Sequence, residues 1–356
     1  MKIIKLVACF LACLIALSLA ACVVNDQNEQ EEQKTPMVKT SFDYFDTVCA
    51  IYSYADESNE EFANNCAEIE EIFKKYDKEL DIYYEHSGIN NLCTVNKKAG
   101  KGAVEISREL MDFLVYAKEI YTLTGGKTNI AMGAVLSIWH DAREDAEYDP
   151  TSAYVPSIDE LSAAAEHTSI DALLLDEENL TVTFADPGLK LDVGALGKGY
   201  VAELCAKMLE EKGVSSYVLN VGGNIRAIGT RTNGDGWITG ITNPDKSSDE
   251  SFCARIMLKN TSCVTSGNYE RYYELDGVRY HHIIDPVTLM PAEYFSSISV
   301  ICLDSALADA LSTALFCMSY EDGLSLVNTL EGVDVLWVYS DGSQEMTEGF
   351  RKNAVK

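Results

Sequence analysis

Two segments in the C-terminal third of this chain constrain its fold and its chemistry more than any other part of the sequence. The first runs from Tyr280 to Pro286 (YHHIIDP) and follows an Asp276-Gly277 pair that separates two strand-like runs. Asp-Gly pairs favour type I′ turns, so this segment is predicted to end a β-hairpin. The second segment, residues 308–314 (ADALSTA), is predicted to be a helix rich in small residues.

The predicted helix can present two oxygen ligands to one hard cation. Asp309 and Thr313 are four residues apart, and residues at this spacing lie on one helix face. Mg²⁺ takes one or two protein carboxylates and completes its shell with water and substrate phosphates. The apolar neighbours of Asp309 indicate a buried, paired or metal-bound carboxylate. Side chains alternate along a strand, so only one of His281 and His282 can face this site. A histidine beside such a cation would indicate phosphate-ester chemistry.

The N-terminal residues carry an export pattern. Two lysines precede an apolar run from Leu6 to Leu19, which is too short to span a bilayer comfortably as a permanent helix. Small residues then precede Cys22, as in lipoprotein signals; an ordinary secretory signal is the alternative. This pattern predicts a folded part held by a lipid anchor on the extracytoplasmic face of the cell membrane. The predicted parts are a lipoprotein signal peptide (1–21), a flexible tether from the lipidated cysteine (22–40) and one catalytic domain (41–350).

Charge and cysteine usage exclude several classes of function. The formal net charge of −28 gives no basic footprint for nucleic acid, and it also excludes electrostatic docking on anionic lipid. Eight cysteines follow Cys22, and they form no CxxC or CxxxC pair. A zinc site or a thioredoxin-like motif is therefore not expected. The even number leaves disulfides open.

Helical and strand-like stretches are mixed along the chain without a regular strand–helix–strand alternation. This mixture predicts the α+β class, with mixed sheets and flanking helices. The predicted elements are a strand at 47–54, helices at 60–80, from Ser107 to 122 and after Ser157, a hairpin at 172–184, and strands at 217–228 and 237–241.

Three glycine-bearing segments are candidates for ligand contact. Residues 192–200 (DVGALGKGY) follow a strand and open a helix, so backbone N–H groups and Lys198 could hold an anion. Their spacing matches neither common phosphate-binding pattern, and a glycine turn with a solvated lysine is the alternative. Residues 221–224 (VGGN) lie inside a predicted strand, which indicates a bulge or close approach by a ligand. Residues 123–133 are predicted to form a small-residue loop after a helix.

Taken together, these segments resemble the ApbE-type flavin transferases, also called FAD:protein FMN transferases, from about Phe42 to Val338. The resemblance rests on DVGALGKGY, NVGGNIRAIG, TSGNYERYY followed by HHIIDP, and ADALSTAL, all in the family's order and spacing. TGGKTNIAMGAVLSIWH resembles the family's flavin loop in a clostridial-type variant. The family's fold is a single T-fold-related catalytic unit of the α+β class.

The resemblance also implies a reaction. FMN would pass from FAD to a threonine or serine of a partner protein through a phosphoester, with Mg²⁺ on the pyrophosphate and release of AMP. The implied partner is an acceptor flavoprotein, either an Rnf/Nqr-type membrane subunit or an exported electron-transfer protein. Two rival functions use the same site: hydrolysis of FAD to FMN and AMP, and non-catalytic storage of FAD by a lipoprotein.

Individual residues match the family's site positions. His282 matches the catalytic-site histidine, which could take the proton of the acceptor hydroxyl. Asp309, Thr313 and the backbone carbonyl of Ala195 match the magnesium ligands. The matched flavin-nucleotide contacts are Phe45, Tyr83, Lys127, Thr128, Asn129, Asp192, Lys198, His282 and Ile283.

Three positions depart from the family's pattern. Leu289 replaces the usual glycine after HIIDPxT, so the turn there could differ in geometry. Asn129 stands where many members have aspartate, and residues 45–47 (FDT) replace a methionine-glycine-threonine start. These departures affect the expected adenine and ring contacts more than the metal site.

Overall fold

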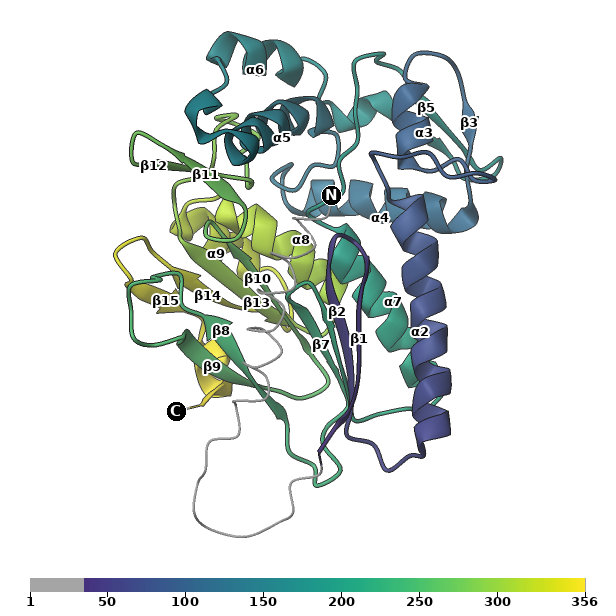
Figure 1. Ribbon diagram of the computed structural model, residues 1–356, viewed down its shortest axis with the longest axis vertical. Coiled ribbons are helices and arrows are strands. Elements are labelled where there is room, and N and C mark those ends of the chain that lie inside the picture. Colours follow the sequence, from purple (N-terminus) through teal and green to yellow (C-terminus); the bar gives the residue numbers. More distant parts are fainter. Residues whose placement is uncertain (1–34, 356) are drawn as a thin grey trace.

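The structure is a computed structural model that describes residues 35–355, and an eight-stranded sheet forms its centre (Figure 1). All neighbouring strands of this sheet pair antiparallel. In spatial order the strands are β1 (Met37–Tyr44), β2 (Thr47–Ser53), β6 (Tyr217–Val221), β7 (Asn224–Ile228), β10 (Ser262–Gly267), β13 (Ser297–Cys302), β14 (Asp334–Val338) and β15 (Gln344–Met346).

Helices cover one face of this sheet, and Figure 1 shows α2, α7 and α8 beside it. The covering helices are α2 (Asn59–Glu79), α7 (Gly197–Glu211), α8 (Ser305–Phe316) and α9 (Tyr320–Val327), and α4 (Arg108–Leu123) packs against α7. A capping box starts α2, because the Ser58 hydroxyl accepts from the Glu61 N–H while the Glu61 carboxylate accepts from the Ser58 N–H. Ile69 and Phe73 of α2 are fully buried against the sheet.

A second sheet covers the opposite face. It contains β8 (Trp237–Thr242), β9 (Phe252–Leu258) and β16 (Ala354–Val355), with α10 (Glu348–Asn353) beside it. Along β6, Tyr217, Leu219 and Val221 belong to the helix-side core, whereas Val218 belongs to the core between the sheets. This period of two shows that both faces of the central strands are buried.

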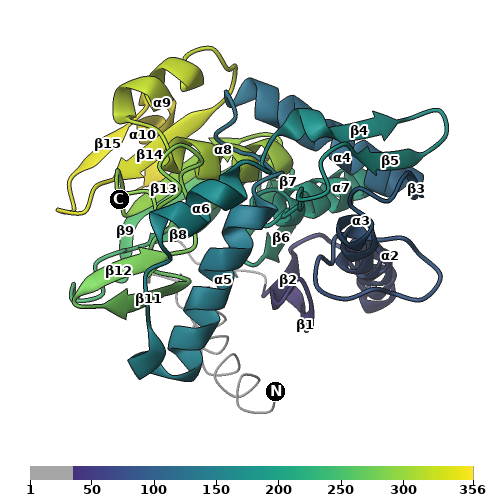
Figure 2. The same cartoon turned by 90° about the horizontal axis from the view of Figure 1, so that it is seen from above.

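A smaller helical part packs on the hairpin that precedes His282. Figure 2 shows α5 running beside the hairpin, with α6 next to α5. These elements share a separate apolar cluster around Trp139 and Leu161. The elements of this region are α5 (Gly133–Tyr148), α6 (Ile158–Ala165), β11 (Tyr272–Leu275) and β12 (Val278–His281). The remaining elements are α3 (Leu92–Lys97), β3 (Val104–Glu105), β4 (Leu173–Asp176), β5 (Thr181–Phe184) and two short 3₁₀ turns at 150–152 and 170–172.

The α+β class is confirmed, and so are the helix starts that depend on local chemistry. The hydroxyl of Ser107 accepts from the N–H of Leu110 at 3.0 Å and caps α4. Ser157 caps α6 through the N–H of Glu160 at 3.2 Å. Asp276 and Gly277 adopt φ values of 52° and 79°, as the predicted type I′ turn between β11 and β12 requires.

The bulge predicted at Gly222-Gly223 is wrong. These residues form a tight turn between β6 and β7, with φ values of 59° and 93°, so the predicted strand 217–228 is two strands. A Cβ atom on Gly222 would lie 2.6 Å from the Thr47 hydroxyl, and its N–H donates to the Val48 carbonyl at 3.0 Å. β2 therefore approaches Gly222 closely, and the predicted approach by a ligand stays a prediction.

The ends of the fold differ from the expected boundaries. β1 begins at Met37, so the last residues of the segment predicted as a tether (22–40) belong to the sheet. At the other end β16 pairs with β9 beyond residue 350. The predicted signal peptide and Cys22 lie outside the described residues. Within 35–355, no helix has the length and apolar character needed to cross a bilayer.

The described cysteines form no disulfides. All eight between residues 35 and 355 are free thiols, and seven of them are buried. Burial raises the pKa of thiols such as Cys263 and Cys302 to about 12. These side chains therefore act as small apolar groups in the core.

Candidate active site

The crossing of α7 and α8 fixes the carboxylate of Asp309. Its Oδ2 atom accepts from the backbone N–H of Gly199 at 2.8 Å and from the Asn224 side-chain amide at 3.0 Å. Asp309 is only 5% exposed, and this burial raises its pKa, while the nearby Lys198 ammonium and the two hydrogen bonds lower it. The carboxylate is thus held in place from three elements of the fold, α7, β7 and its own helix α8.

The oxygens predicted to hold Mg²⁺ make no hydrogen bond to other parts of the described chain. They are Oδ1 of Asp309, the hydroxyl of partly buried Thr313 and the carbonyl of Ala195. Continuation of α7 toward its N-terminus would bond the Gly199 N–H to the Ala195 carbonyl, but this N–H donates to Asp309 instead. One carboxylate and two neutral oxygens suit a cation that completes its shell with phosphates. Between residues 35 and 355, no three His, Cys, Asp or Glu side chains gather into a different metal site.

Asn224 is a site residue that the sequence reasoning missed. It is buried at the start of β7, and its amide fixes Asp309 of α8, 85 positions away in the chain. The only sequence signal was its place directly after the Gly222-Gly223 pair. Once that pair is recognised as a turn, Asn224 stands first on a strand in the centre of the sheet.

We expect Gly199→Ala to damage both the fold and the predicted metal site. A Cβ atom at this position would lie 2.4 Å from both Asp309 Cβ and the Ser305 carbonyl oxygen, so the two helices must separate. Overpacking of this kind costs about 1–3 kcal/mol, and it also displaces the Asp309 carboxylate. Thermal unfolding and the Mg²⁺ dependence of turnover measure the two effects. Gly197→Ala is the matched control, because its Cβ would meet only the flexible Leu80 side chain at 3.3 Å; equal effects of both variants would contradict this explanation.

The two neighbouring histidines have different roles. His281 is buried; its Nε2–H donates to the Ala292 carbonyl at 2.9 Å, and its Nδ1 accepts from the Ile283 N–H at 3.2 Å. Both of its ring nitrogens are therefore occupied within the fold. His282 is partly exposed, and its Nδ1 lies 3.2 Å from the Arg271 carbonyl, which can only accept. The proton of neutral His282 is thus on Nδ1, which leaves the lone pair of Nε2 free to accept a proton.

The surroundings of His282 keep its ring neutral. Burial, the charge of Arg271, and the nearby His281 and Arg143 lower its pKa to about 3. At neutral pH the imidazole therefore carries no charge and can act as a base. Ile283, predicted as a flavin contact, places its side chain in the apolar core beneath α8.

The loop predicted to contact flavin is tied to the other parts of the site. The ammonium of Lys127 pairs with the buried carboxylate of Asp285 at 2.9 Å. The buried Thr128 hydroxyl donates to the Ala310 carbonyl of α8 at 2.8 Å. The Asn129 amide donates to the Thr168 carbonyl beyond α6, and its oxygen accepts from the Ala131 N–H of the same loop. These three side chains therefore brace the loop, and their contact with flavin stays a prediction.

Of the other predicted nucleotide contacts, Asp192 is tied to this loop through its N–H, which donates to the Ile130 carbonyl at 2.8 Å. Asp192 is partly buried, and its Oδ1 accepts from the Gly194 N–H at 2.9 Å. The Lys198 ammonium lies 3.5 Å from the Gly194 carbonyl on the same turn. The ring of Tyr83 is 54% exposed, which leaves it available for stacking. Phe45 occupies a tight turn with φ 55°, and its ring packs edge-on against the core.

Leu289, which stands where the resemblance implies a glycine, has a backbone conformation typical of glycine. Its φ is 61°, in the left-handed region that favours glycine. The side chain is buried in the cluster around Trp139, and Trp139 Nε1 donates to the Leu289 carbonyl at 2.9 Å. Packing therefore holds this turn in a conformation that a leucine rarely adopts.

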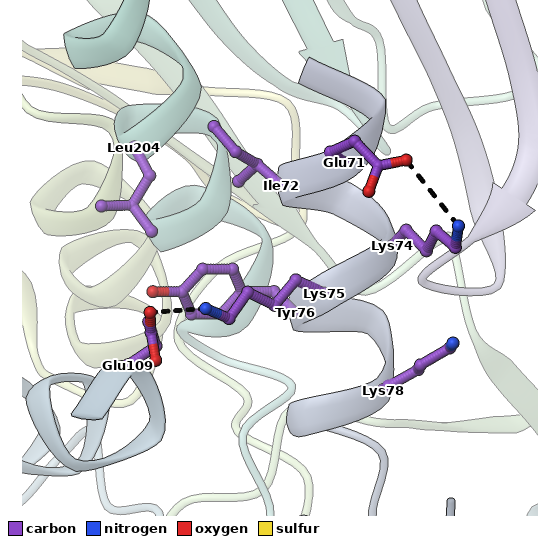
Figure 3. Close-up of a pocket in the computed structure, with 8 residues that line it drawn as sticks. All are labelled: Glu71, Ile72, Lys74, Lys75, Tyr76, Lys78, Glu109 and Leu204. Carbon is purple, nitrogen blue, oxygen red and sulfur yellow. Dashed lines mark ion pairs between the residues drawn. The ribbon is translucent and has the colours of Figure 1, made fainter. Parts of the chain in front are cut away.

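A separate hollow of about 630 Å³ lies along α2, away from these residues (Figure 3). None of the predicted site residues lines it. Figure 3 shows that Lys74 and Lys75 pair with Glu71 and Glu109 there, so little uncompensated charge remains. Its lining residues are Glu71, Ile72, Lys74, Lys75, Tyr76, Lys78, Glu109 and Leu204.

Sequence comparison places the chain in a family. The profile of the ApbE family matches residues 45–337, a span that contains Asp309, Thr313, Ala195 and His282. The chain belongs to the ApbE family. A relative named FAD:protein FMN transferase from Treponema pallidum is 31% identical over 305 residues, which cover 83% of this chain and 82% of that protein. A relative of the same name from Haemophilus influenzae is 29% identical over 329 residues and covers 90% of each chain.

Solved structures of ApbE proteins share the fold. The crystal structure of the ApbE protein from Thermotoga maritima matches 90% of this chain and all of its own, with a TM-score of 0.78 and 28% identity. The flavin transferase ApbE from Vibrio cholerae matches with a TM-score of 0.73 at 22% identity, a similarity that concerns the fold alone.

Proposed function

We propose that this ApbE-family chain is a Mg²⁺-dependent FAD:protein FMN transferase. The proposal is carried by two features on neighbouring elements, since Ile283 packs with Ala308 and Leu311 of α8 in one apolar cluster. One is a fixed carboxylate, Asp309, with a free oxygen for a metal; the other is a neutral histidine, His282, with a free Nε2 lone pair. The names of the curated relatives support the same activity.

The chain's own residues have defined tasks in this reaction. Asp309, Thr313 and the Ala195 carbonyl would hold Mg²⁺, which neutralises pyrophosphate charge and stabilises the AMP leaving group when bound. The acceptor hydroxyl attacks the FMN phosphorus, and Nε2 of His282 takes its proton. The new P–O bond joins FMN to the acceptor side chain. The old P–O bond breaks with its electron pair on the AMP phosphate.

The place of the reaction and its acceptor are also part of the proposal. The N-terminal pattern that ends at Cys22 supports a lipid-anchored enzyme on the extracytoplasmic face of the membrane. Its acceptor would then be an exported or membrane-bound redox protein with an accessible threonine or serine. The lipid anchor would hold the enzyme near such a partner. The acidic chain would then need no electrostatic attraction to anionic lipid.

The deciding experiment incubates the protein with FAD, Mg²⁺ and an exported flavoprotein domain, followed by mass spectrometry of the domain. A mass gain equal to covalent FMN, together with AMP and dependent on Mg²⁺, is the expected result. AMP and free FMN without a mass gain on any acceptor domain tested would favour FAD hydrolysis. Tight FAD binding without AMP would favour a storage protein, and either outcome would overturn the transferase proposal.

A further inference from the structure

Two arginines lie next to His282; within residues 35–355 Arg271 has no carboxylate partner, and Arg143 has only a long ion pair. Arg271 directly precedes β11, and its carbonyl accepts from both the backbone N–H and the ring of His282. The exposed guanidinium of Arg271 makes no hydrogen bond or ion pair with the described chain. For Arg143 the nearest carboxylate oxygen belongs to exposed Glu147 and is 3.9 Å away.

The packing of α5 on the β11–β12 hairpin brings Arg143 close to His282. Trp139 of α5 stacks on Tyr280 of β12, with ring centroids 6.0 Å apart and planes inclined by 20°. Arg143 is four residues further along and therefore lies on the same helix face. Its Nη2–H donates to His140 Nδ1 at 3.0 Å, and the His140 ring lies 5.5 Å from the ring of Tyr83. The guanidinium is thus fixed between the hairpin of His282 and a predicted flavin contact.

The two arginines add positive charge beside His282. Burial lowers the pKa of Arg143, Glu147 raises it and the charge of Arg271 lowers it further; both arginines also lower the pKa of His282. Like charges held close together destabilise each other, and the rest of this chain has ample acidic residues that could have paired with them. A bound anion between the two guanidinium groups would remove this repulsion.

We propose that Arg143 and Arg271 bind the phosphoryl oxygens of the FMN half of FAD. The inference rests on the proposed transferase function. Arginine presents paired N–H donors that match phosphate oxygens. Charge increases on these oxygens when the acceptor hydroxyl attacks, and fixed donors stabilise it. The phosphorus is then placed between the arginines beside His282 and the metal ligands on α7 and α8.

The proposal can be tested by binding, independently of turnover and of any acceptor. The affinities of the protein for FMN and for riboflavin, which lacks the phosphate, are measured by flavin fluorescence for Arg143→Gln and Arg271→Gln. Each variant is expected to weaken FMN binding at least about tenfold and to leave riboflavin binding unchanged, because only FMN offers phosphoryl oxygens. Arg279→Gln is the matched control, since Arg279 lies on the same hairpin over the Tyr272 ring at 4.2 Å and pairs with Glu274; it should change neither affinity.

Two outcomes would overturn the proposal. If FMN and riboflavin lose affinity equally, the arginines support the ring pocket or the fold rather than the phosphate. Unchanged FMN affinity in both variants would mean that the pair binds another anion, such as a carboxylate of the acceptor segment. Failure of the transferase proposal gives a different result. The protein would still bind FMN more tightly than riboflavin through the arginines, but no FMN would be transferred to an acceptor. When transfer is active, each variant should also lower kcat by about 100-fold, the usual effect of removing one such donor.

Discussion

Asp309→Asn is expected to abolish FMN transfer while the fold survives. Asparagine keeps the shape of the side chain and an oxygen for the N–H groups of Gly199 and Asn224, but it loses the negative charge that a cation requires. We expect turnover to fall by at least about 1,000-fold, roughly 4 kcal/mol of transition-state stabilisation. Initial rates across a Mg²⁺ titration measure the effect. Thermal unfolding of the variant checks that the protein remains folded.

Asp304→Asn is the control for this prediction, because it removes a carboxylate from the same helix. Asp304 caps α8 by accepting from the N–H groups of Ala306 and Leu307. Asparagine caps helices about as well as aspartate, so this variant should keep both turnover and Mg²⁺ dependence. If Asp309→Asn turned over normally with Mg²⁺, the assignment of Asp309 to the metal would be wrong.

His282→Asn should slow transfer by about 100- to 10,000-fold, the usual contribution of a general base, and should keep FAD binding. The asparagine amide can still donate to the Arg271 carbonyl, as Nδ1–H does now, so the loss is confined to the Nε2 lone pair. Single-turnover rates and FAD affinity separate the two quantities. His281→Gln is the comparison: it should lower the unfolding temperature but retain kcat, because both ring nitrogens of His281 serve the fold.

The pH dependence gives a second view of His282. Its pKa is lowered from 6.5 to about 3, so the ring stays neutral at every pH above that value. Protonation of His282 in the free enzyme should therefore cause no decline in kcat/KM until the pH approaches that value, because kcat/KM reports free-enzyme pKa values. An acidic limb with a midpoint near 6.5 that disappears in His282→Asn would contradict this.

Local patterns predicted the parts of the site that depend on neighbouring residues in the chain. Asp309 and Thr313 could be placed together because helix geometry brings residues four apart onto one face. The Asp276-Gly277 turn and the caps at Ser107 and Ser157 followed from backbone chemistry in the same way. These features require no knowledge of the rest of the fold.

Partners that are distant in sequence could not be predicted. The fully buried Arg226 pairs with Glu203 at 3.0 Å and Glu210 at 2.9 Å, although charged residues are usually solvated. Glu203 also accepts from the N–H of Ser305 at 2.9 Å, so this ion pair joins β7, α7 and the start of α8. The Gly222-Gly223 turn was missed for a related reason. The strand-like sequence pattern continues on both sides of the two glycines. Only the pairing of β6 with β7 shows that the chain reverses direction there.

The different exposure of the described thiols allows a dye to be attached at one chosen position. Seven of the eight described cysteines are enclosed by the core, whereas Cys253 on β9 is partly exposed. β9 covers the face of the central sheet opposite α7 and α8, so a fluorophore there would lie across the sheet from Asp309, the proposed metal ligand. A maleimide dye added to the folded part should therefore attach at one position. Energy transfer from that dye to bound flavin would report nucleotide arrival and departure in real time.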